Sequence, residues 1–265
     1  MTNPLHISSR DNPLLQKLRK LSQDGASYRK LGEIWLEGDH LCRAAVQRGR
    51  TVLQAVLSET AWQDARLREL ADAAARVVIV APPLFKTLTT LESPSGIGFV
   101  LPLEAQPALQ PAIASIVLDR LQDAGNVGSI LRCAAAFGVG QVIALKGSVA
   151  LWSPKVLRAA MGAHFAVGLV EGLEPNDLDT LRIPLVGTSS HAKRVVHDIS
   201  LPDPCAWVFG HEGQGIDVQL QRRCALLARI PQPGGEESLN VSAAAAVCLY
   251  ESSRQRSRAR LDLNR

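Results

Sequence analysis

The sequence predicts an α/β protein built on a mostly parallel sheet, and two observations support this fold class. Short apolar runs alternate with helical segments along the 265 residues, and 46% of the chain is apolar, which is enough for a sizeable core. Short buried strands separated by helices are typical of parallel sheets that are covered on both faces. The length fits roughly two domains.

Residues 1–104 are expected to form a small α/β domain. Leucines 14, 15, 18 and 21 share one face and predict a helix over Asn12–Leu21. Further helices are expected at Asp39–Arg48 and Ala61–Ala75, and strands at Glu33–Leu36, Val52–Leu57, Arg76–Val80 and Gly96–Leu101. Three prolines within Pro102–Pro111 indicate a linker, which we place at 105–112.

Residues 113–265 show the alternation more clearly and are expected to form the second domain. An alanine-rich helix is predicted from Asn240 to Gln255. Strands are expected at Ser115–Leu118, Gln141–Leu145, Pro184–Gly187, Ala206–Phe209 and Leu226–Ile230.

Composition narrows the functional class. The net charge of +4 and pI near 8.9 permit nucleic-acid binding without establishing it. The five cysteines form no CxxC pair, so we expect buried thiols in a reducing cytoplasm and no metal site. The polar first ten residues do not resemble a secretion signal, and apolar runs such as Val241–Tyr250 are too short to cross a membrane.

Three polar segments with glycines carry the candidate chemistry. The first follows a predicted strand and contains Asn126, expected to cap a helix that Gly138 ends. Gly128 and Arg132 share a face of that helix. Taken alone, Asn126 could have no role beyond capping the helix, and Arg132 could be an ordinary solvent-exposed side chain. A nucleotide loop of the Rossmann type is disfavoured because no G-x-G-x-x-G occurs.

The other two segments also follow predicted strands. In Phe209–Ile216, Glu212 stands among glycines, and in Ile230–Ser242 the polar residues Ser238 and Asn240 precede the last helix. Each alone is also compatible with a tight turn or a helix cap. Because open α/β sheets bind ligands at the carboxyl ends of their strands, we expect one site built from these loops.

Together and in this order, the segments resemble the three signature motifs of the SpoU (TrmH) family of RNA ribose 2′-O-methyltransferases, within the SPOUT superfamily. The matching residues are Asn126, Gly128 and Arg132; Phe209, Gly210, Glu212 and Gly215; and Ile230, Pro231 and Glu237–Ser242. The resemblance covers Ser115–Glu251, and Ser9–Pro13 and Leu36–Leu41 are similar to the substrate-binding domain of many members. Two departures are Ala124, where proline is usual, and His211, where asparagine or serine is common.

The resemblance implies a parallel sheet with a deep C-terminal trefoil knot, preceded by the small α/β substrate-binding domain. It implies a cytoplasmic homodimer that binds S-adenosylmethionine in the knot and methylates a ribose 2′-oxygen of RNA at the subunit interface. It assigns cofactor-binding positions to Gly210, Ile230 and Leu239. We add Ser238 from the third motif, and Thr188 because it ends a predicted strand at the place where it could join them.

The resemblance also assigns catalytic roles. Arg132 is the main catalytic residue, either as a general base or as a cation that clamps phosphate and stabilises the developing alkoxide. We prefer the cation, because a guanidinium stays protonated in proteins. Asn126 and Glu212 are expected to orient Arg132 and the substrate, and Asn240 with Ser238 to support the ribose.

The first domain contains the residues that we expect to contact RNA. Arg10, Lys17, Arg19 and Lys20 crowd one short region and are predicted to contact RNA phosphates, although a solvated helix face would look the same. A separate N-terminal domain favours ribosomal RNA. The alternatives are a transfer RNA 2′-O-methyltransferase, a non-catalytic RNA-binding protein of the same fold, or an ordinary doubly wound nucleotide-dependent enzyme.

Overall fold

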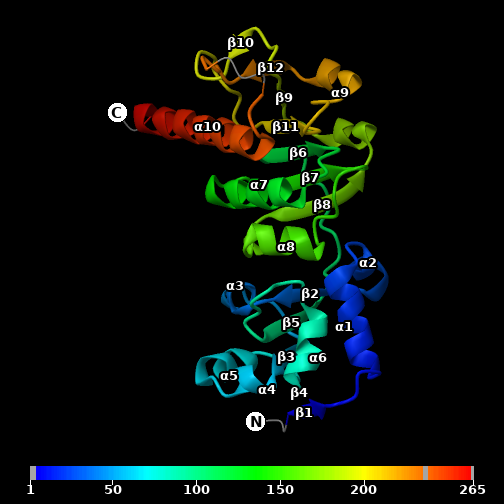
Figure 1. Cartoon of the computed structure of the whole chain (residues 1–265). Helices are drawn as coiled ribbons and strands as arrows, with labels where there is room; N and C mark the ends of the chain where they lie inside the picture. The colour runs from blue at the N-terminus through cyan, green and yellow to red at the C-terminus, as the bar shows by residue number, and fades with distance from the viewer. Residues whose placement is uncertain (1–3, 235–237, 264–265) are drawn as a thin grey trace. The chain divides into compact units, whose positions relative to one another are not determined.

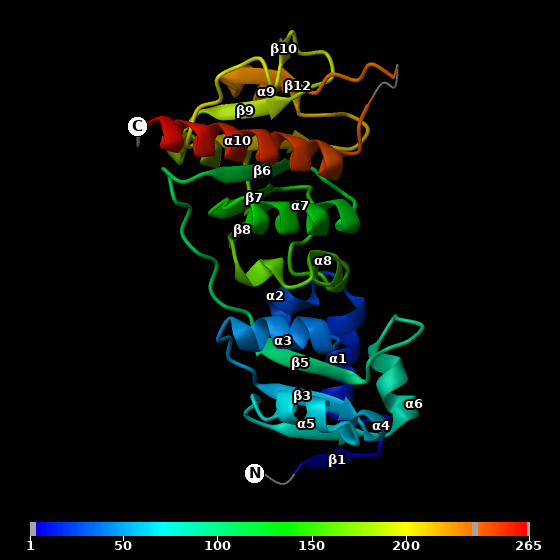
Figure 2. The same ribbon diagram turned by 90° about the vertical axis from the view of Figure 1, so that its left-hand side faces the viewer.

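A computed structural model describes residues 4–234 and 238–263 (Figures 1 and 2). The chain divides into two compact units. The first comprises Met1–Ala105 and Trp152–Phe165, and the second comprises Gln106–Leu151 and Ala166–Arg265. Residues 152–165, which the sequence led us to place in the second domain, therefore pack with the first unit.

The first unit contains a five-stranded sheet of order β1-β4-β3-β5-β2. Its strands are β1 (Leu5–Ile7), β2 (Glu33–Glu37), β3 (Gln54–Ser58), β4 (Val77–Val80) and β5 (Ile97–Pro102). The sheet is mixed, because β4 runs parallel to β1 and β3 whereas β5 runs antiparallel to β2 and β3. Strand β1 was not predicted, since three residues give too short a pattern to recognise.

Helices of the first unit follow the local capping signals. Asn12 accepts a hydrogen bond from the Leu14 N–H, and Pro13 occupies the first turn, which starts α1. The predicted single helix Ala61–Ala75 is wrong: Asp64 caps a second helix by accepting from Arg66 N–H, which divides the segment. The helices are α1 (Pro13–Gln23), α2 (Ser27–Leu31), α3 (Asp39–Gln47), α4 (Glu59–Trp62), α5 (Ala65–Ala71), α6 (Pro82–Phe85) and α8 (Pro154–Ala160).

The second unit contains a seven-stranded sheet of order β10-β12-β9-β11-β6-β7-β8 in which every recorded strand pair is parallel. Its strands are β6 (Ser115–Asp119), β7 (Gln141–Leu145), β8 (Gly168–Leu173), β9 (Leu185–Thr188), β10 (Arg194–Val195), β11 (Ala206–Gly210) and β12 (Leu226–Arg229). The predicted parallel sheet is confirmed. Strands β8 and β10 were missed, because β8 contains two glycines and a glutamate and β10 has two residues.

Three α-helices of the second unit are α7 (Ala124–Ala136), α9 (Val218–Arg223) and α10 (Val241–Leu263). Helices α7 and α10 lie side by side against the sheet (Figures 1 and 2). Helix α10 continues past the predicted end at Gln255, because arginine, alanine and leucine in its last turns favour helix. None of the described helices has the length and apolar character needed to span a bilayer.

The parallel sheet sets the position of the candidate site. Strands β6, β9, β11 and β12 all point the same way, so the loops that follow them emerge at one edge. Beneath that edge lies a core of aliphatic side chains from the strands, including the fully buried Val117, Ile143 and Val208. The loops therefore rest on a rigid base.

Candidate active site

The first motif opens helix α7. Asp123, in extended conformation, accepts a 2.7 Å hydrogen bond from the Asn126 N–H and is the N-cap. The expectation that Asn126 caps this helix is therefore wrong: Asn126 is the third helical residue, and its side chain is available for other contacts. Gly138 has φ +71° just beyond the helix, as its predicted C-terminal role requires.

The second motif places the Glu212 carboxylate at the start of α7. Glu212 accepts hydrogen bonds from the backbone N–H groups of Asp123 at 3.0 Å and Gln122 at 3.2 Å. It also accepts from Asn126 Nδ2 at 3.3 Å. A negative charge is favourable at this helix end, where N–H groups lack intrahelical partners.

These contacts keep the Glu212 carboxyl ionised. Partial burial acts to raise its pKa, but the hydrogen bonds from the backbone and from Asn126 outweigh burial and lower the pKa below its ordinary value. The Glu212 residue is exposed, so solvent reaches this hydrogen-bonded carboxylate.

The third motif closes the network. Asn240 Nδ2 donates to Asn126 Oδ1 at 3.0 Å, while Asn240 Oδ1 accepts from Ser242 N–H at 2.9 Å and Ala243 N–H at 3.3 Å. Asn240 thus caps α10 and contacts α7 at once. Asn126 stands in the middle, donating to Glu212 and accepting from Asn240, so one hydrogen-bonded chain joins all three motifs.

Arg132 lies outside this chain. It is exposed on α7, six residues beyond Asn126. Its guanidinium makes no hydrogen bond or ion pair with any residue that the structure describes. The structure thus brings Asn126, Glu212 and Asn240 together and leaves Arg132 as an available cation on the same helix.

The predicted cofactor positions lie at the ends of neighbouring strands. Thr188, the last residue of β9, donates from Oγ1 to the Val208 carbonyl at 3.2 Å. Gly210 ends β11, and a Cβ there would fall 2.1 Å from the Ile216 nitrogen. Glycine is therefore required here by the backbone of its own loop.

The segment after β12 offers unused backbone groups. Within the described residues, the backbone of Ile230–Gly234 and of Ser238 and Leu239 makes no hydrogen bond. Leu239 is an exposed apolar side chain, at 41% of its full surface. Backbone groups with no partner among the described residues, together with the exposed Leu239 side chain, suit a ligand that has both a polar periphery and a flat apolar ring. Glu237, part of the third motif, lies outside the described residues.

His211 has a local role in the second motif. Its Nδ1 accepts from the Gly213 N–H at 3.0 Å, and its carbonyl accepts from the Gly215 N–H at 2.8 Å, so it closes the turn around Glu212. Among the described residues, no group of three histidine, cysteine, aspartate or glutamate side chains is arranged to hold a metal ion.

Sequence reasoning missed two residues at this edge, Asp119 and Arg120, at the end of β6. Arg120 donates to Gln214, and Asp119 accepts from Arg120 and from the Asp217 N–H, so both contact the loop that carries Glu212. A charged pair directly after the apolar run Ile116–Leu118 was the available signal.

Comparison with known proteins places this architecture in a family of RNA-modifying enzymes. Residues 114–250 match the family described as the SpoU rRNA Methylase family. An uncharacterised tRNA/rRNA methyltransferase of Synechocystis, slr1673, is 32% identical over 94% of this chain and 93% of its own length. The 23S rRNA (guanosine-2′-O-)-methyltransferase RlmB of Bordetella pertussis is 39% identical over 61% of this chain and 65% of its own.

Solved structures agree over nearly the whole chain. The SpoU methyltransferase AviRb of Streptomyces viridochromogenes, in complex with S-adenosylmethionine, superposes with a TM-score of 0.85 at 26% identity, covering 92% of this chain and 98% of that one. The chain belongs to the SpoU rRNA methylase family, and the family predicted from the three motifs is confirmed.

Proposed function

We propose that the protein transfers a methyl group from S-adenosylmethionine to a ribose 2′-oxygen of RNA, with ribosomal RNA as the favoured substrate. Similar proteins bear the names of 23S rRNA 2′-O-methyltransferases. The observation that carries the proposal is the hydrogen-bonded chain from Asn240 through Asn126 to Glu212, since it assembles three separate motifs at one sheet edge.

The residues present fit the cofactor. Gly210, Ile230 and Leu239, with Thr188 and Ser238, are the positions we assign to its binding. Backbone groups of Ile230–Gly234 and Ser238–Leu239 that have no partner among the described residues supply donors and acceptors for its polar groups, and exposed Leu239 supplies a surface for its adenine ring. Bound S-adenosylmethionine supplies an activated methyl group on a sulfonium that leaves as a neutral thioether.

The chain's own residues position the acceptor. The ribose 2′-oxygen forms the new O–C bond as the C–S bond breaks, and its hydroxyl proton passes to solvent. Arg132 clamps the adjacent phosphate and stabilises the developing negative charge on oxygen, a role that needs no loss of its proton. Glu212 and Asn126 hold the start of α7 and the loop after β11 together in front of the substrate, and Asn240 with Ser238 supports the ribose.

A homodimer would complete this site. Arg132 lies outside the hydrogen-bonded network of its own chain, so we place the partner subunit's Arg132 beside the network of the first. Exposed apolar side chains on α10 support such an interface: Tyr250 is 58% and Val247 is 40% exposed. The Tyr250 ring packs edge-on against Phe137, which follows α7, at 6.3 Å between centroids.

Complementation between two impaired variants tests the shared site. Arg132→Ala and Glu212→Gln proteins are each assayed alone and after mixing under conditions that exchange subunits. If each site draws on both chains, a mixed dimer contains one site free of either substitution, and methyl transfer rises above the sum of the two separate proteins. Activity that stays at that sum after verified subunit exchange would contradict the shared site.

We retain Arg10, Lys17, Arg19 and Lys20 as RNA contacts. Two of these side chains are exposed, and the other two already contact residues of their own unit. Arg10 and Lys20 are exposed. Lys17 lies 2.7 Å from Glu33, and Arg19 donates to Thr87 at 2.9 Å, so part of their capacity is used within the unit. Arg10 and Lys20 therefore carry most of the proposed phosphate contact.

Salt dependence tests this assignment. Replacing Arg10 and Lys20 with alanine should weaken RNA binding and reduce the slope of log affinity against log salt by about one unit or less per lost phosphate contact. Arg48→Ala, at an exposed arginine of the same unit, is the control for charge removed elsewhere. An unchanged slope in the double variant would refute the assignment.

The trefoil knot and the cytoplasmic location complete the proposal. Strand β11 enters the sheet between β6 and β9, both formed earlier in the chain, and this non-sequential order supports a crossover of the kind a knot requires. Five cysteines without disulfides support a reducing compartment.

The proposed function is tested first at the cofactor. Calorimetric titration with S-adenosylmethionine should show saturable binding without RNA. Arg132→Ala should bind it normally and lose methyl transfer, and Arg132→Lys should also lose most transfer, because lysine lacks the planar fork. Absence of cofactor binding up to millimolar concentration would refute the proposal.

A further inference from the structure

A buried carboxylate lies directly behind the Glu212 loop, which we define as residues 211–217. Asp119, the last residue of β6, is 3% exposed. Its carboxylate accepts from Arg120 Nε at 2.9 Å, from Arg120 Nη2 at 3.1 Å and from the Asp217 N–H at 2.7 Å. A buried charge with three donors is well satisfied, and one of these donors belongs to the Glu212 loop.

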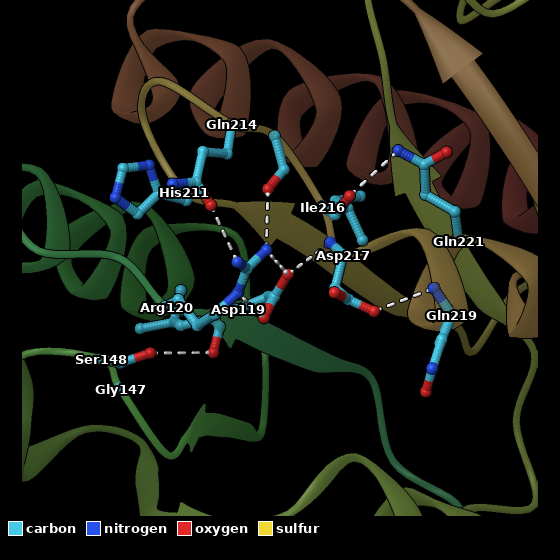
Figure 3. Close-up of polar contacts among 12 residues, drawn as sticks. Asp119, Arg120, Gly147, Ser148, His211, Gln214, Ile216, Asp217, Gln219 and Gln221 are labelled. Carbon is cyan, nitrogen blue, oxygen red and sulfur yellow. Dashed lines mark hydrogen bonds and ion pairs between the residues drawn. The ribbon is translucent and has the colours of Figure 1, made fainter.

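Arg120 extends this contact into the loop itself. Its Nη1 donates to Gln214 Oε1 at 3.0 Å and its Nη2 lies 3.4 Å from the Gly215 carbonyl. Figure 3 shows the guanidinium between Asp119 and the loop residue Gln214, with the Asp119 carboxylate also joined to Asp217. One planar group thus joins the end of β6 to the far side of the loop that carries Glu212.

The backbone at Arg120 is also unusual. Arg120 has φ +59°, in the left-handed region that residues with a Cβ seldom adopt. Gly147 accommodates this conformation, since a Cβ there would lie 3.2 Å from Arg120 Cγ. The bend directs the next N–H groups, of Gln122 and Asp123, toward Glu212. Both the strained backbone of Arg120 and its side chain therefore contribute to holding the Glu212 loop in place.

We infer that Arg120, anchored by Asp119, is a positioning residue for methyl transfer: it holds the Glu212 loop against β6 so that the Glu212 carboxylate meets the start of α7. This inference rests on the proposed function. Arg120 acts through Gln214 and Gly215, while its anchor Asp119 holds the Asp217 N–H, and neither residue is proposed to touch the substrate. Loss of the guanidinium should leave the sheet intact and allow Glu212 to move away from Asn126.

The decisive variant is Arg120→Gly. Glycine adopts a positive φ without strain, so the substitution removes the bridge while relieving the backbone. We expect the melting temperature to equal or exceed that of Arg120→Ala, kcat to fall at least tenfold, and the KM for RNA to stay within twofold. Arg120→Lys should restore part of kcat, because an ammonium reaches Asp119 without forming the fork.

Arg223→Ala is the matched control. Arg223 pairs with Asp179 at 2.5 Å in the same unit and is the last residue of α9, at the helix end opposite the Glu212 loop, so its removal should leave kcat within twofold of the wild type. Arg120→Gly with kcat also within twofold of the wild type would overturn the inference. So would a fall in kcat that Arg223→Ala matches, since the effect would then be general.

Amide hydrogen exchange separates this inference from the proposed function. In Arg120→Gly the amides of residues 211–217 should exchange at least tenfold faster, while those of β7 remain protected, whether or not the protein methylates RNA. If the wild type shows no methyl transfer but the loop still loosens, the proposed function fails and the bridge stands. Unchanged exchange across residues 211–217 would refute the bridge itself.

Discussion

Glu212→Gln is the substitution that tests the geometry of the site most finely. Glutamine has nearly the shape of glutamate but keeps only one acceptor oxygen. In the wild type one carboxylate oxygen receives Asp123 N–H and Asn126 Nδ2, and the other receives Gln122 N–H. The glutamine amide would direct its own hydrogens at one of these donor sets, so one or two hydrogen bonds must be lost.

The size of the effect follows from those bonds. A hydrogen bond to a charged group is worth roughly 1.5–3 kcal/mol when buried. Because Glu212 is exposed and screened by solvent, we take about 1 kcal/mol for each bond lost. The loss of one or two bonds then destabilises the assembled loop by about 1–2 kcal/mol, and misplacement at the site is expected to lower kcat by about tenfold or more. The melting temperature should fall by only a few degrees.

The assay is methyl transfer under saturating cofactor and RNA, with melting temperature measured in parallel. Glu69→Gln, at an exposed glutamate of the first unit, controls for the loss of one negative charge. If Glu212→Gln retains kcat within twofold of the wild type, the network does not position catalytic groups and the reasoning fails.

The same carboxylate predicts a pH dependence. Because the pKa of Glu212 is lowered in the folded state, its contribution to stability is present above the ordinary value of 4.5 and is lost as pH falls through the lower folded pKa. The difference in melting temperature between wild type and Glu212→Gln should therefore be largest near neutrality and shrink below about pH 4.5. A difference that grows on acidification would contradict the assigned shift.

Three further predictions use local geometry. Gly210→Ala should lower the melting temperature substantially because its Cβ would overlap the Ile216 nitrogen, whereas Gly213→Ala, with no atom nearer than 3.9 Å, should be tolerated; equal melting temperatures would contradict this. Asn126→Ala should lower kcat about tenfold while helix content by circular dichroism is retained, because Asp123 caps the helix; a loss of helix would show that Asn126 does. Burial raises the thiol pKa of Cys205 and Cys248 to about 12, so iodoacetamide at pH 8 should modify them only after unfolding, as peptide mass spectrometry would show.

The parallel sheet and its loops were predictable because they rest on local patterns. The buried runs at Gln141–Leu145 and Ala206–Gly210 are continuous and, apart from Gln141, without polar side chains, and their strands begin where predicted. Edge strands β1 and β10 were not predictable, since two or three residues leave no periodicity to detect. The break between α4 and α5 depends on the cap at Asp64, which the periodic apolar pattern obscured.

The sequence indicated that the three motif loops meet at one sheet edge, but not the contacts among their residues. Asp123 and Asn126 are both good N-cap residues, and the sequence alone does not distinguish them. The structure assigns the cap to Asp123, while Glu212, 89 residues later, receives the N–H of Asp123 and the Asn126 amide. The partnership of Lys17 with Glu33 and the bridge from Arg120 to Gln214 were likewise invisible, because each joins residues distant along the chain.

The most direct test of the central claim is the identity of the product. Ribosomal RNA lacking the modification is incubated with the protein and S-adenosylmethionine, digested to nucleosides and analysed by mass spectrometry, with transfer RNA treated in parallel. We expect one nucleoside whose additional methyl group lies on the ribose, produced by the wild type and absent with Arg132→Ala. A methyl group on the base, or equal product from the Arg132→Ala protein, would contradict the account.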